Sequence, residues 1–205
     1  MTRTMQAMAG LAIAVLSLGS VPIAAPAAES PRAVIEATTD AVLGVLRNGS
    51  LTADDKRRRI EDVVYARVDF DTLSRLVLAQ NWKTLTEAQR TNFVHEFKRH
   101  LALSYGKNVD SYRNEHVAIE GEREEARGDW TVKTKIVRGG PDDIAVDYRL
   151  RQTEGTWRII DFIIEGVSLV SNYRSQFQEI MAHGGVERLL DLLREKNAKG
   201  EPLKS

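Results

Sequence analysis

The sequence predicts an α+β fold with an antiparallel sheet of about four strands, arranged as a meander. The sheet is expected to pack against helices from the N- and C-terminal parts of the chain. An apolar pocket is expected between the sheet and the helices. Apolar residues recur at three- and four-residue steps over residues 31–105 and again over 168–193, as in amphipathic helices. From about residue 117 to 164 they follow a strand-like pattern, and the turns between segments are short. Short turns join neighbouring antiparallel strands.

The composition is that of an ordinary globular protein. The 205 residues carry 29 Lys+Arg and 29 Asp+Glu, so there is no basic excess to suggest a nucleic-acid partner. The chain has no cysteine, and disulfides therefore contribute nothing to its stability. Its core must hold the fold together without covalent links.

Residues 1–27 are predicted to be a secretory signal peptide. Arg3 lies in a short basic region, Ala7 to Leu18 are apolar and uncharged, and Ala25-Pro26-Ala27 forms a small-residue cleavage site. We expect cleavage after Ala27, with Ala28 as the second choice and an uncleaved anchor as the alternative. The apolar segment is short for spanning a bilayer. The expected product is an exported protein with one domain at 28–197 and a disordered tail at 198–205.

Three helices are predicted before residue 80. Ser30-Pro31 opens the first, and Asn48-Gly49 ends it. The second begins at Thr52, and the third spans Asp69 to Leu78. The basic run from Lys56 to Arg59 is interpreted as a solvated face of the second helix; docking to an acidic partner or to membrane headgroups is the less favoured alternative.

The fourth predicted helix has the clearest boundaries. Thr86 and Gln89 have the spacing of a capping box, in which each residue satisfies a backbone N–H near the other, and Gly106 ends the helix. Four large apolar residues follow at four-residue steps: Phe93, Phe97, Leu101 and Tyr105. Such a stripe is more often part of a core than of a ligand site.

The segment from Trp157 to Phe177 joins the sheet to the last helices. Residues 157–164 form a nearly continuous apolar run, typical of a strand that is covered on both faces. Gly166 is predicted to be a hinge and Ser168 the N-cap of the following helix. That helix is predicted to end at Gly184-Gly185, before a last helix.

The sequence contains no clear catalytic or metal-binding constellation. His95 and His100 are five residues apart, so on a helix they point in different directions and are not expected to share a metal ion. Ser168 lacks the second glycine of a nucleophile elbow. Asp161, inside the apolar strand, could act as a general base if buried, but we favour pairing with a charged group or with backbone N–H groups.

The segment from Asp161 to Phe177, with the pattern D-x-x-x-E-G-V-S-L-V-x-N-Y-R-x-Q-F, resembles the signature of the MlaC family, the periplasmic phospholipid-binding proteins of the toluene-tolerance group. Val68-Asp69-Phe70, Trp82 and Gly184-Gly185 occur in the same order as in that family. One departure is Ala79, where the family usually has glycine, a residue that adopts positive φ far more readily than alanine.

The resemblance implies a periplasmic shuttle for phospholipid. It would carry lipid between an inner-membrane Mla transporter complex and an outer-membrane lipoprotein–porin complex, and so maintain outer-membrane lipid asymmetry. The acyl chains would lie between sheet and helices, with the headgroup near the mouth of the pocket. No cofactor and no bond-breaking step are expected, and we expect a monomer. A hopanoid-associated branch of the family is also similar, so a hopanoid-associated lipid carrier is an alternative.

The expected lipid-binding residues come from the strands and from the helices. The strand face would supply a wall and a floor, and the helical stripes would approach from the other side, although a slip of one residue would exchange the two faces of a strand. The wall and floor are expected from Val132, Ile136, Val146, Tyr148, Ile163 and Val167, and the helical residues are expected to be Leu76, Phe93, Phe97, Leu101, Tyr105, Tyr173 and Phe177. Arginine at position 146 or 167 is expected to abolish lipid retention.

Two other hypotheses are kept beside the carrier. One is a small α+β isomerase-like enzyme that uses Asp161 as its general base. The other is a periplasmic binding adaptor with a filled core. Lipid that can be extracted from the purified protein would favour the carrier, whereas an interior packed solid with side chains would exclude it.

Overall fold

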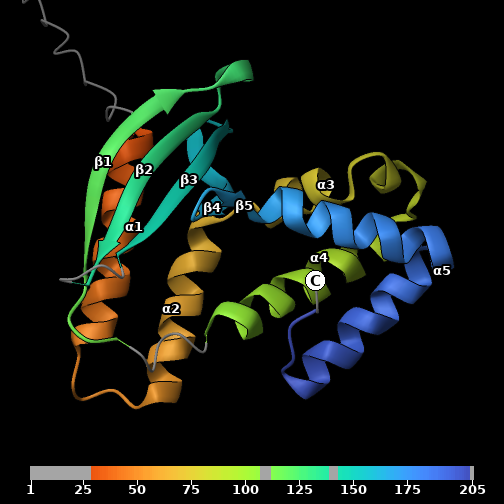
Figure 1. The fold of residues 1–205 in the computed structure, drawn as a ribbon, viewed down its shortest axis with the longest axis horizontal. Coiled ribbons are helices and arrows are strands. Elements are labelled where there is room, and N and C mark those ends of the chain that lie inside the picture. The colour runs from red at the N-terminus through yellow and green to blue at the C-terminus, as the bar shows by residue number, and fades with distance from the viewer. Residues whose placement is uncertain (1–28, 107–111, 139–142, 204–205) are drawn as a thin grey trace, which may run out of the picture.

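The helices and strands follow one another in the predicted order (Figure 1). The computed structural model describes residues 29–106, 112–138 and 143–203, so the predicted signal peptide lies outside the described residues. The elements are α1 (Pro31–Arg47), α2 (Ala53–Arg67), α3 (Phe70–Leu78), the 3-10 helix η1 (Ala79–Thr84), α4 (Glu87–Tyr105), β1 (His116–Glu124), the short turn η3 (Ala126–Gly128), β2 (Trp130–Val137), β3 (Ile144–Thr153), β4 (Thr156–Ile164), β5 (Val167–Ser168) and α5 (Leu169–Lys199).

Within the described residues the sheet has five strands in the order β1-β2-β3-β4-β5, and each neighbouring pair is antiparallel. The meander is as predicted, but the prediction of about four strands missed β5, which has two residues. Glu165 and Gly166 adopt φ of 49° and 78° and form a tight two-residue turn, so Val167 and Ser168 pair back onto β4. Gly166 is therefore part of a hairpin turn rather than a hinge.

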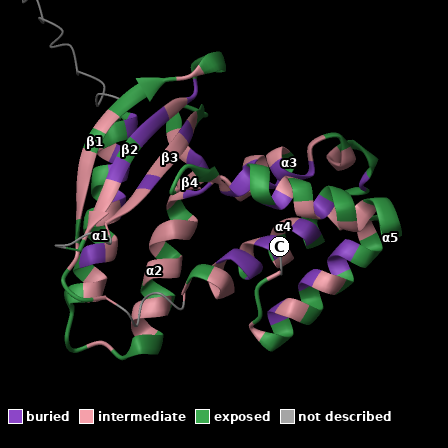
Figure 2. Ribbon diagram, in the orientation of Figure 1, coloured by how far each residue is buried: buried purple, intermediate pink, exposed green. Residues whose placement is uncertain are grey.

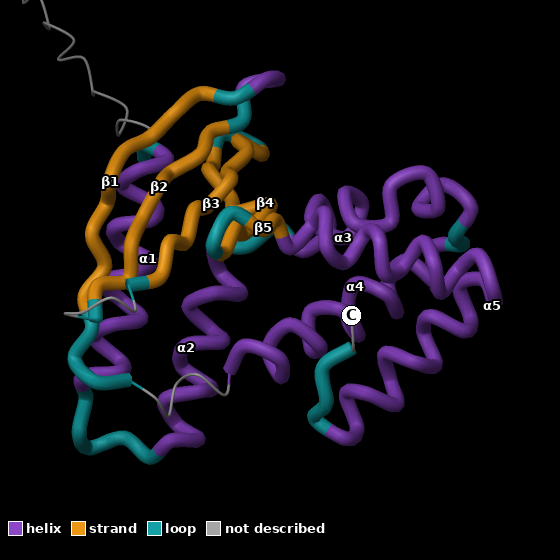
Figure 3. The backbone as a smooth tube through the Cα atoms, viewed as in Figure 1, coloured by secondary structure: helices purple, strands orange, loops and turns teal. Residues whose placement is uncertain are grey.

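The helices form two groups on either side of β4 (Figures 1 and 3). α1 packs on β1 and β2, and α2 packs on α1 and β4. α3, α4 and α5 pack on one another beyond the sheet. The link between the groups runs through Val68 and Asp69, because Val68 forms a bridge with Ile159 of β4 and the Asp69 N–H donates to the Ile159 carbonyl over 2.9 Å.

An aromatic cluster fills the space between α4 and α5. Phe93, Phe97, Tyr173 and Phe177 are buried, and the ring centroids of contacting pairs are 5.0–5.6 Å apart. Figure 2 shows the buried residues along the facing sides of these two helices. Most of the contacts are edge-to-face, the geometry that aromatic rings prefer. This part of the interior is a packed core.

The junction from β4 to α5 is organised by Asp161, whose exposed fraction is 1%. Its Oδ2 accepts a hydrogen bond from the Ser168 hydroxyl over 2.6 Å, and its Oδ1 accepts one from the Val170 N–H over 3.0 Å. The Ser168 Oγ in turn accepts from the Ser171 N–H, which confirms the predicted N-cap. Arg149 lies 3.8 Å from the same carboxylate. The favoured interpretation of Asp161, as a partner of backbone N–H and charged groups, is confirmed.

The C-terminal segment differs from the predicted tail. α5 is broken at Gly185, whose φ of 66° and ψ of −168° interrupt the helix, in agreement with the predicted boundary between two helices. The second half continues to Lys199, and Leu203 packs against the core. A disordered tail from residue 198 was expected, but residues 198–203 are placed by the helix end and by this apolar contact; residues 204–205 lie outside the described part.

Ala79 occupies an unfavourable backbone conformation. It follows the last residue of α3 with φ of 51° and ψ of −121°, and its N–H donates to the Arg75 carbonyl. A Cβ atom disfavours positive φ, which glycine adopts readily. The departure from the family's glycine at this position therefore introduces strain.

We predict that Ala79→Gly stabilises the protein by about 1 kcal/mol, because relief of the strain exceeds the extra entropy of glycine in the unfolded chain. Urea unfolding followed by circular dichroism measures the change. Ala41→Gly is the matched control, since Ala41 is exposed inside α1 and should lose about 1 kcal/mol. A loss of stability in Ala79→Gly would contradict the strain.

His100 is a fully buried imidazole on α4. Its Nδ1 lies 3.2 Å from the Asn197 Oδ1, and its Nε2 accepts from the Leu203 N–H over 3.4 Å, an arrangement that suits the neutral ring with its proton on Nδ1. Burial lowers the pKa of His100 below its ordinary value of 6.5. The unfolded chain therefore binds a proton at a higher pH than the folded protein does.

We predict that the free energy of unfolding falls as the pH drops below 6.5 towards the lowered pKa of His100, because protons favour the unfolded state in that range. Urea unfolding at a series of pH values between neutrality and mildly acidic conditions measures the slope. His100→Gln should flatten it, whereas His183→Gln, at an exposed position, should leave it unchanged. Equal slopes in the native protein and His100→Gln would be incompatible with this role.

Candidate functional site

Two neighbouring cavities lie between the sheet and the helices. The first, of about 260 Å³, lies between α2, α4 and the end of β4. The second, of about 420 Å³, lies between α1, α2 and the face of the sheet. Five side chains line both: Ile60, Val64, Tyr105, Phe162 and Ile164. The cavities are therefore two lobes of one apolar region that meet beside α2.

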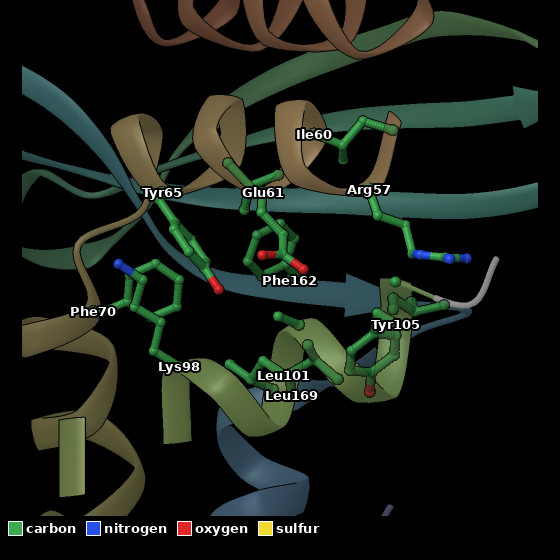
Figure 4. A pocket seen from close by; sticks show the side chains of 14 residues that line it. Arg57, Ile60, Glu61, Tyr65, Phe70, Lys98, Leu101, Tyr105, Phe162 and Leu169 are labelled. Carbon is green, nitrogen blue, oxygen red and sulfur yellow. The ribbon is translucent and has the colours of Figure 1, made fainter. Parts of the chain in front are cut away.

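Most of the side chains that line the first lobe are apolar or aromatic (Figure 4). Leu101 and Ala102 of α4 face Ile60 and Val64 of α2, and Phe162 closes the side towards the sheet. The charged side chains in the lining are Arg57, Glu61 and Lys98. Figure 4 shows Arg57 near Tyr105 at one end, and Lys98 beside Tyr65 and Phe70 at the other.

The second lobe is formed by alternate residues of the sheet. Ile136, Val146 and Tyr148 belong to one face, because β2 and β3 pair in the register Thr134↔Val146 and Ile136↔Ile144. Burial raises the pKa of the Tyr148 hydroxyl to about 12, so this group stays uncharged at neutral pH. α1 closes the lobe with Val42 and Leu46 among other residues.

Helix α2 has no fully buried residue over its 15 positions. Its inward-facing apolar residues, Ile60 and Val64, line both lobes and are only partly buried. A helix packed on a filled core would bury a full stripe of such residues. The incomplete burial indicates space that side chains of the protein leave unfilled.

Five of the sequence-predicted residues line this space. Leu101 lines the first lobe, Tyr105 lines both, and Ile136, Val146 and Tyr148 line the second. Their contact with lipid stays a prediction, but the structure brings them together as expected from the strand alternation and the end of the α4 stripe.

The remaining predicted residues lie elsewhere. Four of the helical residues, Phe93, Phe97, Tyr173 and Phe177, form the packed cluster between α4 and α5, Leu76 packs against the core, and Val132 is fully buried in it. The α4 residues separate into two groups because an α-helix turns by about 100° per residue. Residues at four-residue steps therefore drift by about 40° per step around the helix, so a stripe that begins against α5 turns towards the cavity at Leu101 and Tyr105.

The predicted floor of the pocket is corrected by the register of β4. Phe162 and Ile164 line the cavities, so Ile163 between them points to the opposite face. Val167 has an exposed fraction of 57% and lies on β5 outside both lobes. Because residues 162–164 are all apolar, alternation alone could not show which of them faces inward.

No general-base site is formed at Asp161. Both carboxylate oxygens accept hydrogen bonds at the start of α5, and the residue does not line either lobe. Over the described ranges, no group of three or more His, Cys, Asp and Glu side chains could hold a metal ion. Of the helices placed in the structure, none is long and apolar enough to cross a membrane.

Two known proteins are similar to this chain in sequence. A toluene tolerance protein, Ttg2D, of Pseudomonas putida is 24% identical over 173 residues, which make up 82% of this chain and 80% of the relative. The intermembrane phospholipid transport system binding protein MlaC of Haemophilus influenzae is 22% identical over 118 residues, or 56% of this chain and 55% of that protein.

A solved structure has the same fold. A phospholipid-binding protein from Ralstonia solanacearum, determined in complex with a phospholipid, superposes with a TM-score of 0.75 at 24% identity, and the match covers 84% of this chain and 98% of that one. The sequence profile described as MlaC protein matches residues 36–195, which is most of the chain. This protein therefore belongs to the MlaC family.

Proposed function

We propose that this protein is a periplasmic phospholipid-binding transport protein that holds the acyl chains of its lipid in the two-lobed cavity. The observation that carries the proposal is an apolar, incompletely filled interior between sheet and helices in a chain of the MlaC family. The phospholipid bound to the Ralstonia relative, and the name of the Haemophilus relative, support the same ligand class.

The cavity lining suits hydrocarbon. Each methylene group removed from water contributes about 0.8 kcal/mol, so acyl chains enclosed by Val146, Phe162 and their neighbours would be retained strongly. The proposal requires binding and release only, with no chemical step. The arrangement of Asp161 favours this interpretation over an enzyme, since its carboxylate is engaged at the helix start.

The proposed route is between the two membranes of the cell envelope. The relative named as a binding protein of an intermembrane phospholipid transport system supports a role in Mla transport. We infer that the chain exchanges lipid with an inner-membrane Mla complex and an outer-membrane lipoprotein–porin complex, as a monomer. The signal peptide expected at residues 1–27 agrees with a periplasmic location.

We predict that Ala102→Trp lowers the amount of phospholipid bound by about half or more. Ala102 lies on α4 and lines the first lobe, so an indole ring there would occupy part of the space proposed for an acyl chain while the helix remains intact. Native mass spectrometry of the purified protein, with identification of the extracted lipid, measures the occupancy. The control is Ala198→Trp, at an exposed position of α5.

Val146→Arg is expected to abolish lipid binding, because Val146 lines the second lobe with an exposed fraction of 8%, and a guanidinium there would oppose hydrocarbon. Val167→Arg is the control, because Val167 is exposed on β5 and lies outside both lobes. This variant is expected to keep its lipid content unchanged. Circular dichroism establishes that each variant is folded. Full lipid content in both Ala102→Trp and folded Val146→Arg would reject the cavity as the lipid site.

A further inference from the structure

A polar groove adjoins the first lobe of the cavity. The groove has a volume of about 470 Å³ and lies between the start of α3, α4 and the hairpin that joins β3 to β4. Its polar lining includes Asp69, Asp71, Thr153, Glu154 and Arg158. Phe70 and Lys98 line both the groove and the apolar lobe. These two residues therefore mark the boundary between an apolar space and a polar one.

Lys98 is held at this boundary by aromatic rings. Its Nζ lies 3.6 Å from the ring centroid of Tyr65 and 5.3 Å from that of Phe70, and these two rings meet edge to face with centroids 5.5 Å apart. Figure 4 shows the three side chains gathered at one end of the lobe. A cation over aromatic faces is attracted by the ring quadrupoles, and this attraction fixes the position of the ammonium group.

Lys98 is half-buried, and in the part of the chain that the structure describes no ion pair joins it to a carboxylate. The arginines that line the lobe and the groove already have partners within the protein. Arg57 at the opposite end of the lobe pairs with Asp54, and Arg158 in the groove donates to the Ala66 carbonyl. A partly desolvated ammonium gains most from an anionic partner, and it keeps N–H donors available beyond the aromatic contact.

In a diacyl phospholipid the negative charge of the phosphate lies directly beyond the acyl chains. The Lys98 ammonium likewise lies at the boundary where the apolar lobe ends. With the acyl chains in the apolar lobe, the phosphodiester would come next, followed by the polar headgroup. Phosphate accepts charge-assisted hydrogen bonds from lysine. The carboxylates of Asp71 and Glu154 in the groove suit the cationic amine of a zwitterionic headgroup, which lies beyond the phosphate.

We propose that Lys98 binds the phosphodiester of the lipid, and that the headgroup lies in the polar groove bounded by α3 and the β3–β4 hairpin. This assignment rests on the proposed function and makes it specific: the protein distinguishes a phospholipid from an uncharged diacyl lipid by the charge at Lys98.

The test compares Lys98→Met, which keeps an apolar stem and removes the charge, with Lys98→Arg, which keeps the charge. Delipidated protein is titrated with dioleoylphosphatidylcholine and, separately, with dioleoylglycerol, which lacks the phosphate. Lys98→Met should bind the phospholipid roughly tenfold more weakly, as expected for loss of a hydrogen bond to a charged group, and should bind dioleoylglycerol as the native protein does. Lys98→Arg should restore most of the affinity for the phospholipid.

Lys83→Met, an exposed lysine that lines neither cavity nor groove, is the matched control and should bind both lipids normally. If Lys98→Met weakens the binding of both lipids equally, Lys98 has a packing role over the aromatic rings and the assignment is overturned. Unchanged binding of the phospholipid by Lys98→Met would also overturn the assignment. Displacement of phospholipid by excess inorganic phosphate would identify a site for free anions instead. Failure of the native protein to bind either lipid would reject the proposed function itself.

Discussion

The hydrogen bonds of Asp161 determine how the sheet and the helical layer are joined. A carboxylate with an exposed fraction of 1% loses its hydration, and here Ser168 and the Val170 N–H replace the lost water contacts. The same bonds place a negative charge at the start of α5, where the helix dipole favours it. Because β4 ends in a tight turn and a two-residue strand, α5 leaves the sheet in a fixed direction. α4 packs against α5, and side chains of α4 line the first lobe.

The interior is divided between a packed part and an open part. The aromatic rings between α4 and α5 fill their space and supply the cohesion that disulfides would otherwise give. On the other side of α4, side chains that face α2 and the sheet leave two lobes. A cavity of this kind lowers stability, because its lining lacks packing partners. The dense aromatic core allows the fold to tolerate the open half.

Local signals predicted most of the architecture. The capping box at Thr86, the N-cap at Ser168 and the break at Gly185 all depend on neighbouring residues, and each is observed. The face of β4 was not determined in this way, because residues 162–164 are uniformly apolar and only the pairing with β3 fixes which side points inward. The apolar stripe on α4 was misassigned for a related reason. Phe93 packs in a filled core and Leu101 lines an open lobe, and the helical spacing of apolar residues does not distinguish these two environments. Lys98 gave no sequence signal, since its aromatic neighbours come from α2 and α3.

Helix α2 has no fully buried side chain, whereas α1, α4 and α5 each bury several. Isolated helices of this length are marginal in water, and α1 with β4 supplies most of its contacts. Any cargo that occupies the lobes adds packing to Ile60 and Val64, and by mass action it stabilises the form that binds it. The order of α2 is thereby coupled to occupancy.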